Sequence, residues 1–315
     1  MTTLTHDAGS RSVSAALPGI GYALVSALAF GMAGSLAKGL VEAGWSTGAV
    51  AVVRILGGFA VLAIPAAMAM RGRWSLLGDN TRFIALYGVT AVAVAQFCFF
   101  SAVVHLQVGV ALLIEYTAPV LVVAWFWFRH GAVPTRTTVI GMVLAGLGLV
   151  LLLDLAGAGV NLVGVLWGLG AMAGLAMYFV LSAQERAGLP PLVLAAGGLL
   201  VGGLALLAAG ALGLIPLAAA FVEVPLAGAS VAWWVPMAAL VVLASALAYV
   251  TGIEATRRLG ARFASFVGLA EVVAALLFAW LLLSELPGLV QLLGGVLVLA
   301  GVVAVKAGER PLVAA

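Results

Sequence analysis

Long apolar segments recur along the whole chain, separated by short polar stretches. Each segment has about 20 residues, the length of a helix that crosses a hydrocarbon core about 30 Å thick. The alternating polar and apolar pattern of a β-barrel, the other structure that satisfies every backbone group in lipid, is absent. The pattern therefore predicts an all-α membrane protein with ten transmembrane helices, at residues 17–40, 46–70, 83–104, 108–128, 137–155, 162–182, 191–214, 231–253, 262–284 and 288–306.

The second half of the chain repeats the first at a constant offset of 153 residues. The matches include rare residue types and equally spaced glycines: Trp127 with Trp280, Pro134 with Pro287, Gly141 with Gly294 and Gly148 with Gly301. Each repeat holds five predicted spans, and five is odd, so the second repeat enters the membrane inverted. Inverted repeats recur in secondary transporters, where two halves rock about a central site. We expect an N-terminal tail at 1–16, repeats at 17–155 and 162–306, and a C-terminal tail at 307–315.

Composition and charge placement agree with a membrane location. Hydrophobic residues make up 65% of the chain and charged residues 8%, against roughly 25% charged residues in soluble domains. If the N-terminus is cytoplasmic, twelve of the fourteen Lys and Arg residues fall on the inner side, Lys38 falls outside and Arg54 lies within a span. The positive-inside rule then places both tails in the cytoplasm of a multi-pass protein of the inner (cell) membrane. Anionic inner-leaflet lipid accounts for the basic excess, so we expect no nucleic-acid partner.

Three ionisable side chains lie deep within predicted spans: Arg54, Glu115 and Glu271. Insertion of a charged residue at a helix centre costs about 2.5–3.5 kcal/mol on insertion scales. Such residues therefore usually pair with another polar group or have a function in the protein. Arg54 and Glu115 share a depth, which allows an ion pair. In the functional hypothesis, Arg54 holds a substrate carboxylate while Glu115 or Glu271 meets an ammonium group or carries a proton. The alternative is a structural ion pair, or an Arg54 that extends to the surface.

Five further side chains on these helices complete the candidate site. Pro119 removes a backbone hydrogen bond near Glu115 and predicts a kink that opens a cavity or serves packing alone. The aromatic and amide side chains are those of Tyr22, Gln96, Tyr116 and Tyr249. For each of these, the alternative is a side chain that bonds to a neighbouring backbone or lies at the membrane interface.

Several segments resemble EamA-type ten-helix exporters of the drug/metabolite transporter superfamily. They are VVRIL at 52–56, ATRRLGAR at 255–262, AEV at 270–272, LSELP at 283–287 and QLLGG at 291–295. One departure is Val272, where the family commonly has proline after the glutamate. The segment EYTAP at 115–119 is similar to the Glu-aromatic-x-x-Pro segment of the threonine/homoserine exporter branch. The resemblance implies outward transport of amino acids or related small metabolites.

No pattern in the sequence predicts an enzyme. It contains no phosphate-binding Gly-Lys-Ser/Thr loop, no His/Cys cluster with metal spacing, and no serine with a base at membrane depth. We therefore expect no catalytic residues, no metal and no cofactor, with a small-molecule substrate and the lipid bilayer as partners.

The prediction is a secondary transporter that exports amino acids or related zwitterions by alternating access. Two alternatives stay open. One is efflux of lipophilic cationic drugs, in which Glu115 or Glu271 attracts the charge and Arg54 is structural. The other is a membrane scaffold or lipid-handling protein without a transport cycle. The exact substrate, proton coupling and oligomeric state are left open by the sequence.

Overall fold

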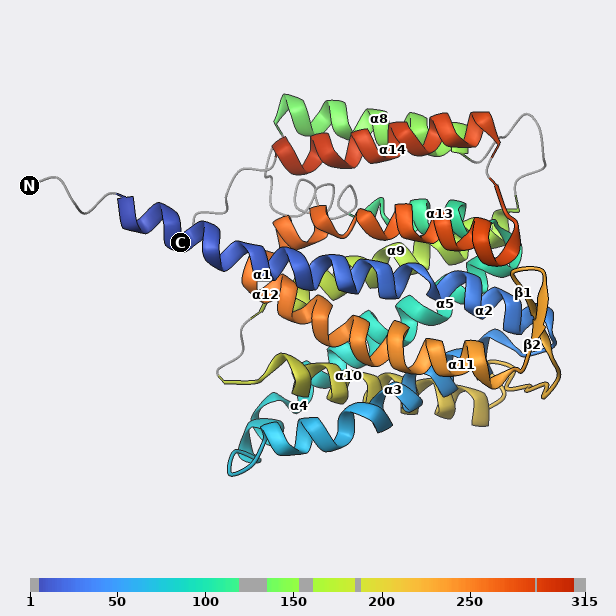
Figure 1. Ribbon diagram of the computed structural model, residues 1–315, viewed down its shortest axis with the longest axis horizontal. Coiled ribbons are helices and arrows are strands. Elements are labelled where there is room, and N and C mark those ends of the chain that lie inside the picture. The colour runs from blue at the N-terminus through green and yellow to red at the C-terminus, as the bar shows by residue number, and fades with distance from the viewer. Residues whose placement is uncertain (1–5, 119–134, 153–160, 185–187, 287, 309–315) are drawn as a thin grey trace, which may run out of the picture.

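The chain forms a bundle of helices whose axes are roughly parallel or antiparallel to one another (Figure 1). This computed structural model describes residues 6–118, 135–152, 161–184, 188–286 and 288–308. The described ends of the chain, His6 and Gly308, lie at the same end of the bundle. Below, this end is called the terminal end, and the other the distal end.

The first repeat contains seven α-helices and one π-helical segment among its described residues. They are α1 (His6–Gly31), α2 (Ala33–Glu42), α3 (Thr47–Ala69), α4 (Ser75–Tyr87), η1 (Gly88–Val94), α5 (Ala95–His105), α6 (Val108–Glu115) and α8 (Arg136–Leu152). The described part of the second repeat contains six α-helices, one π-helical segment and a pair of strands. It comprises α9 (Leu162–Ser182), α10 (Pro191–Ala211), β1 (Val224–Leu226), β2 (Ala229–Val231), α11 (Trp234–Val241), η2 (Val242–Leu247), α12 (Ala248–Val267), α13 (Ala270–Leu283) and α14 (Leu289–Gly308).

Six helical stretches in the described part of the chain are long and apolar enough to cross a membrane: Pro18–Glu42, Thr47–Ala69, Ser75–His105, Leu162–Ser182, Pro191–Ala211 and Trp234–Leu259. Shorter apolar helices occupy Arg136–Leu151, Ala270–Leu283 and Leu292–Val305. The expected span at 108–128 is described only as far as Ala118, so Pro119 and its predicted kink lie outside the described residues. The protein is a multi-pass membrane protein.

The structure corrects the helix boundaries at two places. Helix α1 begins at His6, within the expected N-terminal tail. Helix α12 continues to Val267, through residues 254–261, where a loop was expected. Here Glu254 and Arg258 form an ion pair one helical turn apart, at 2.6 Å. Charged residues end an apolar span but are good helix formers, so a hydropathy pattern places the helix end too early.

A small β-hairpin lies in the connection between α10 and α11, so the prediction of an all-α protein is wrong to that extent. Strands β1 and β2 pair antiparallel. Ala227 and Gly228, the two turn residues, have φ of 53° and 74°, the left-handed geometry that suits a two-residue hairpin. The Ala227 amide donates to the Leu282 carbonyl at 2.9 Å. The hairpin is thereby held against the distal end of α13 (Figure 1).

Each repeat carries a π-helical segment at the equivalent place. Shifted by 153 residues, η1 at 88–94 becomes 241–247, and η2 spans 242–247. The π-helix is rare and is found mostly as single turns inserted into α-helices, frequently at functional sites. The coincidence agrees with the register read from the sequence and gives both repeats an irregular backbone turn at equivalent residues.

The repeat-equivalent helices α8 and α14 cross each other antiparallel (Figure 1). A Cβ atom on Gly141 would lie 2.6 Å from the Gly301 carbonyl oxygen, and one on Gly148 would lie 2.7 Å from that of Gly294. The 153-residue shift exchanges these two contacts, so the crossing is symmetric. Close approach of backbones at small residues is how helices associate in lipid.

We predict that Gly141→Ala lowers the unfolding temperature of the purified protein. Its new methyl group meets backbone atoms that cannot move aside, and overpacking typically costs about 1–3 kcal/mol. Gly146→Ala on the same helix is the matched control, because no atom lies within 4 Å of its added Cβ. It should leave stability unchanged or slightly raised, since alanine favours a helix over glycine. Equal effects of the two variants in a thermal-unfolding measurement would contradict the tight crossing.

Candidate functional site

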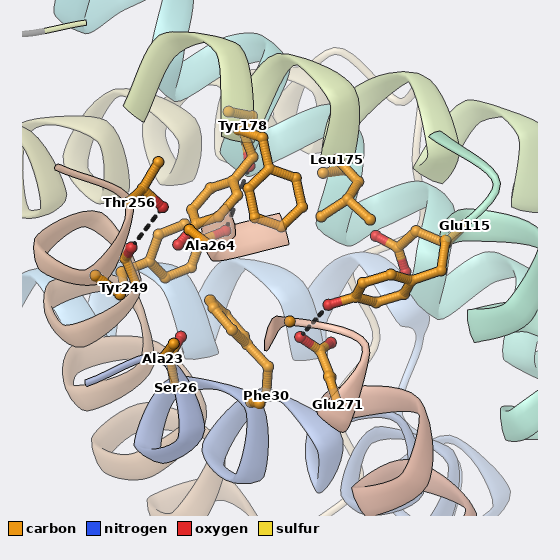
Figure 2. A pocket seen from close by; sticks show the side chains of 18 of the residues that line it. Ala23, Ser26, Phe30, Glu115, Leu175, Tyr178, Tyr249, Thr256, Ala264 and Glu271 are labelled. Atoms are coloured by element: carbon orange, nitrogen blue, oxygen red, sulfur yellow. Dashed lines mark hydrogen bonds between the residues drawn. The ribbon is translucent and has the colours of Figure 1, made fainter. Parts of the chain in front are cut away.

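A cavity of about 50 Å³ lies between the two repeats, where α1, α5, α6, α9, α12 and α13 converge (Figure 2). A water molecule needs about 10–15 Å³ measured in this way, so the cavity has room for a few waters. Its lining contains five of the side chains predicted from the sequence: Gln96, Glu115, Tyr116, Tyr249 and Glu271.

Carboxylates from both repeats lie at one side of this cavity (Figure 2). Glu115 is the last residue of α6 and is 7% exposed. Glu271 lies in the first turn of α13, and its Oε2 accepts a hydrogen bond from the Tyr116 hydroxyl at 2.9 Å. The turn after α6 is fixed by Thr117, whose Oγ1 donates to the Ile114 carbonyl at 2.6 Å. The end of α6 thus directs Glu115 and Tyr116 into the cavity.

Aromatic rings of Phe30, Tyr178 and Tyr249 form another part of the cavity lining. Phe30 packs edge-on against Tyr249 and Tyr178, with ring centroids 5.1 and 6.2 Å apart. Tyr178 and Tyr249 are themselves 5.9 Å apart. Aromatic faces attract cations, most strongly where water is excluded.

The described lining contains two carboxylates and no Lys, Arg or His. Its formal charge is therefore negative when both carboxylates are ionised. A small cation, or the ammonium end of a zwitterion, complements that charge, whereas a free anion does not. The charge of the lining therefore favours ligands that carry a positive group over ligands that are purely anionic.

Arg54 lies behind the cavity and is fully buried, at 0% exposure. Its Nε donates to the Ser245 hydroxyl at 3.0 Å. Its other nitrogens donate to the Gln96 side-chain oxygen and to the Ala244 carbonyl, and its guanidinium carbon lies 5.2 Å from the Phe100 ring centroid. Arg54 reaches the cavity only through Gln96.

The suggested ion pair of Arg54 with Glu115 is absent from the structure. Within the described ranges, ion pairs shorter than 4.0 Å join Lys38 to Glu285 and Arg258 to Glu254. Depth along a helix places two residues at one level but not on facing sides, and this is why the expectation failed. The bonds of Arg54 favour a structural role, with neutral partners in place of a carboxylate.

Arg54 and Tyr249 bind equivalent carbonyls in the two π-helical segments. Arg54 donates to Ala244 in η2, and the Tyr249 hydroxyl lies 3.4 Å from the carbonyl oxygen of Ala91 in η1. Ala91 and Ala244 correspond under the 153-residue shift, and so do Gln96 and Tyr249. Irregular backbone in a membrane protein is tolerated where side chains or a cavity satisfy it. Both π segments meet that condition beside the cavity.

Tyr22 does not belong to the cavity. It is 37% exposed on α1, and the Arg258 guanidinium carbon lies 5.0 Å from its ring centroid. Conversely, the candidate set omitted the cavity residues Phe30 and Tyr178. Aromatic residues are common in spans, so the sequence alone gave no reason to choose these two.

Comparison with known proteins identifies the family. Residues 17–154 and 162–306 each match the model of the EamA-like transporter family. The chain belongs to the EamA-like transporter family. This family forms part of the drug/metabolite transporter superfamily, and its members are membrane transporters of small molecules.

The fold of this EamA-like transporter is shared with a solved structure titled only as the crystal structure of a protein. The two chains are 20% identical and align over 95% of this chain and 99% of the other, with a TM-score of 0.57. At that identity the likeness concerns the fold alone. No curated protein matches the sequence.

The two EamA repeats are also joined by charge at the distal end of the bundle. Lys38 on α2 forms an ion pair with Glu285, in the connection between α13 and α14. The second Glu285 oxygen accepts from the Val108 amide at the start of α6, at 3.2 Å. The two side chains are 17% and 18% exposed. One carboxylate therefore links two helices of the first repeat to the second repeat.

We predict that Arg54 is energetically coupled to Gln96 and much less to Glu115. In a double-mutant cycle, Arg54→Met and Gln96→Leu remove the two ends of one hydrogen bond, so we expect a coupling of about 1–3 kcal/mol in unfolding free energy. The same cycle with Glu115→Gln should give a smaller value. Unfolding in mixed detergent micelles measures both. A larger coupling with Glu115 would restore the ion-pair interpretation.

Proposed function

We propose that this EamA-like transporter exports small metabolites that carry a protonated amine, with amino acids and related zwitterions as the first candidates. The observation that carries the proposal is the cavity between the repeats, which contains Glu115 and Glu271 and no basic side chain in its described lining. Isolated carboxylates at membrane depth are costly to retain without a task. Holding an ammonium group is a task that both carboxylates fit.

Recognition of the amine would combine charge with the aromatic wall. Glu271 and Glu115 accept hydrogen bonds from the ammonium group, and charge-assisted hydrogen bonds are stronger than neutral ones. The rings of Phe30, Tyr178 and Tyr249 would contact the rest of the cargo.

Alternating access would follow from the repeat architecture. In this proposal, ten helices form two inverted repeats, with both tails in the cytoplasm and the distal end facing outward across the inner membrane. The repeats rock about the cavity, as in other inverted-repeat transporters. The ion pair of Lys38 with Glu285 joins the repeats at the distal end, so breaking it would accompany outward opening.

Efflux of lipophilic cations is the second candidate. It is favoured by the aromatic wall and by the burial of Arg54, which leaves no guanidinium to bind a cargo carboxylate. Both candidates require the carboxylates, and both are compatible with a proton that occupies them when cargo is absent. They differ in the need for a carboxylate on the cargo. The likeness to the threonine/homoserine exporter branch supports the first candidate.

We predict that Glu271→Gln lowers amino-acid flux at least about tenfold, because a hydrogen bond to a charged group contributes roughly 1.5–3 kcal/mol. The measurement is release of labelled amino acids, tested as a panel, from proteoliposomes that contain the purified protein. Asp79→Asn is the matched control. Asp79 is an exposed acidic residue on α4, outside the cavity lining, so its loss should leave flux unchanged.

Equal flux in Glu271→Gln and wild type, with equal protein inserted, would overturn the role of Glu271. Absence of wild-type flux for every amino acid, together with efflux of ethidium-like dyes, would favour the cation-efflux candidate.

A further inference from the structure

Glu115 is buried, yet its carboxyl group has no partner among the residues that the structure describes. Glu254, Glu271 and Glu285 each accept a hydrogen bond from a side chain. No hydrogen bond or ion pair within the described ranges reaches the carboxyl group of Glu115, although the residue is only 7% exposed. A buried polar group that lacks hydrogen bonds is destabilising, so one that is retained calls for an explanation. Because Glu115 lines the cavity, a bound ligand is in a position to supply the missing donors.

The adjacent residue, Tyr116, holds the other carboxyl group of the cavity. Tyr116 is 2% exposed, and its hydroxyl donates to Oε2 of Glu271 at 2.9 Å. The bond joins the end of α6 in the first repeat to the first turn of α13 in the second repeat. Within the described residues it is the one hydrogen bond of the Glu271 carboxyl group, so Oε1 is left to accept from a ligand.

Carboxyl groups with unfilled acceptor positions distinguish between cations of equal charge. A primary ammonium group carries three N–H donors, whereas a quaternary ammonium group carries none. Aromatic rings such as those of Phe30, Tyr178 and Tyr249 attract both kinds of cation and are typical partners of quaternary groups. A quaternary group would leave the acceptors of Glu115 unfilled, and a site with buried polar groups rejects a ligand that cannot bond to them.

We propose that Glu115 is a specificity-determining group that requires N–H hydrogens on the cationic group of the cargo, and that Tyr116 is a positioning residue that orients Glu271 toward the same cation. This inference rests on the proposed export of amine-bearing metabolites and adds a rule for their cationic group. The rule is that affinity falls as methyl groups replace the N–H hydrogens. Charge or attraction to the rings gives no such fall, because methylation keeps the charge and adds apolar surface.

The test is isothermal titration calorimetry of the purified protein in detergent. The probes are 2-phenylethylamine and butylamine, each with its N-methyl, N,N-dimethyl and N,N,N-trimethyl derivatives, at a neutral pH at which all of them are cations. The methylation ratio is the dissociation constant of the trimethyl compound divided by that of the primary amine. In at least one series, the wild type should give a ratio of about ten or more, the effect of losing a hydrogen bond to a charged group.

Glu115→Leu removes both acceptor oxygens and should lower the methylation ratio about tenfold. It also removes a charge and weakens every probe, but the ratio compares two cations of equal charge and is insensitive to that loss. Tyr116→Phe removes the hydroxyl that orients Glu271 and should lower the ratio by a smaller factor. In the Glu271→Leu background, Tyr116→Phe should have no further effect, because a positioning residue acts through the residue that it positions.

Glu223→Leu and Tyr22→Phe are the matched controls. They make the same chemical changes at exposed residues outside the cavity lining. Both should keep the wild-type methylation ratio.

A second measurement, thermal unfolding of the variants, needs no ligand. Glu115 has no partner to lose, so Glu115→Leu should leave the unfolding temperature unchanged or raise it. Glu271→Leu should lower it, because the buried Tyr116 hydroxyl then loses its acceptor. A Glu115 that served packing alone would show the reverse, with lower stability in Glu115→Leu and an unchanged methylation ratio.

The assignments fail separately. A wild type that binds the trimethyl compounds as tightly as the primary amines, or a Glu115→Leu variant with the wild-type ratio, would overturn the role of Glu115. An unchanged or higher ratio in Tyr116→Phe would overturn the role of Tyr116. Binding of none of the probes by the wild type would instead contradict the proposed function, a cavity that holds an amine.

Discussion

The cost of burying charge inside an apolar helical bundle is the constraint on which the rest of the structure depends. Lipid offers no partner to Arg54, Glu115 or Glu271, so each must find one within the protein or in a ligand. Arg54 meets this requirement with Gln96, Ser245 and a backbone carbonyl. The two carboxylates instead line the space between the repeats. The ionisable side chains are thereby divided between Arg54, which bonds to protein groups, and two carboxyl groups that line the cavity.

The internal repeat determines where these ionisable side chains lie in the bundle. Equivalent π-helical segments interrupt the third helix of each repeat, and their carbonyls are bound by side chains beside the cavity. Repeat-equivalent residues need not be identical: Gln96 corresponds to Tyr249, and Glu115 to Gly268. The repeat gives two structurally similar halves, and the polar side chains of the cavity lie at positions where the two halves differ in sequence. The symmetric glycine crossing of α8 and α14, by contrast, keeps identical residues, because there only backbone approach matters.

Most of the helical segments and the repeat register were predictable, because both leave strong periodic signals in hydropathy and in rare residue types. The continuation of α12 past residue 253 and the hairpin at 224–231 were not, since local ion pairing and a two-residue turn determine them. Within the candidate site, charge and polarity in a span identified Glu115, Glu271, Gln96, Tyr116 and Tyr249 as cavity residues. Arg54 and Tyr22 lie outside the cavity lining, because sequence gives the depth of a residue but not the direction in which it faces. Phe30 and Tyr178 were missed because aromatic residues are common in spans, and only the packed structure shows which of them line the cavity.

The central claim is that Glu115 and Glu271 form the binding site for the ammonium group of the cargo. Its most direct test is covalent labelling of these carboxylates by a hydrophobic carbodiimide in the purified protein, followed by peptide mass spectrometry, with and without a panel of amino acids and amines. Bound cargo should protect Glu271 or Glu115 in a concentration-dependent way, while labelling of exposed Asp79 stays constant. Labelling of both cavity glutamates that no ammonium compound changes would contradict the claim.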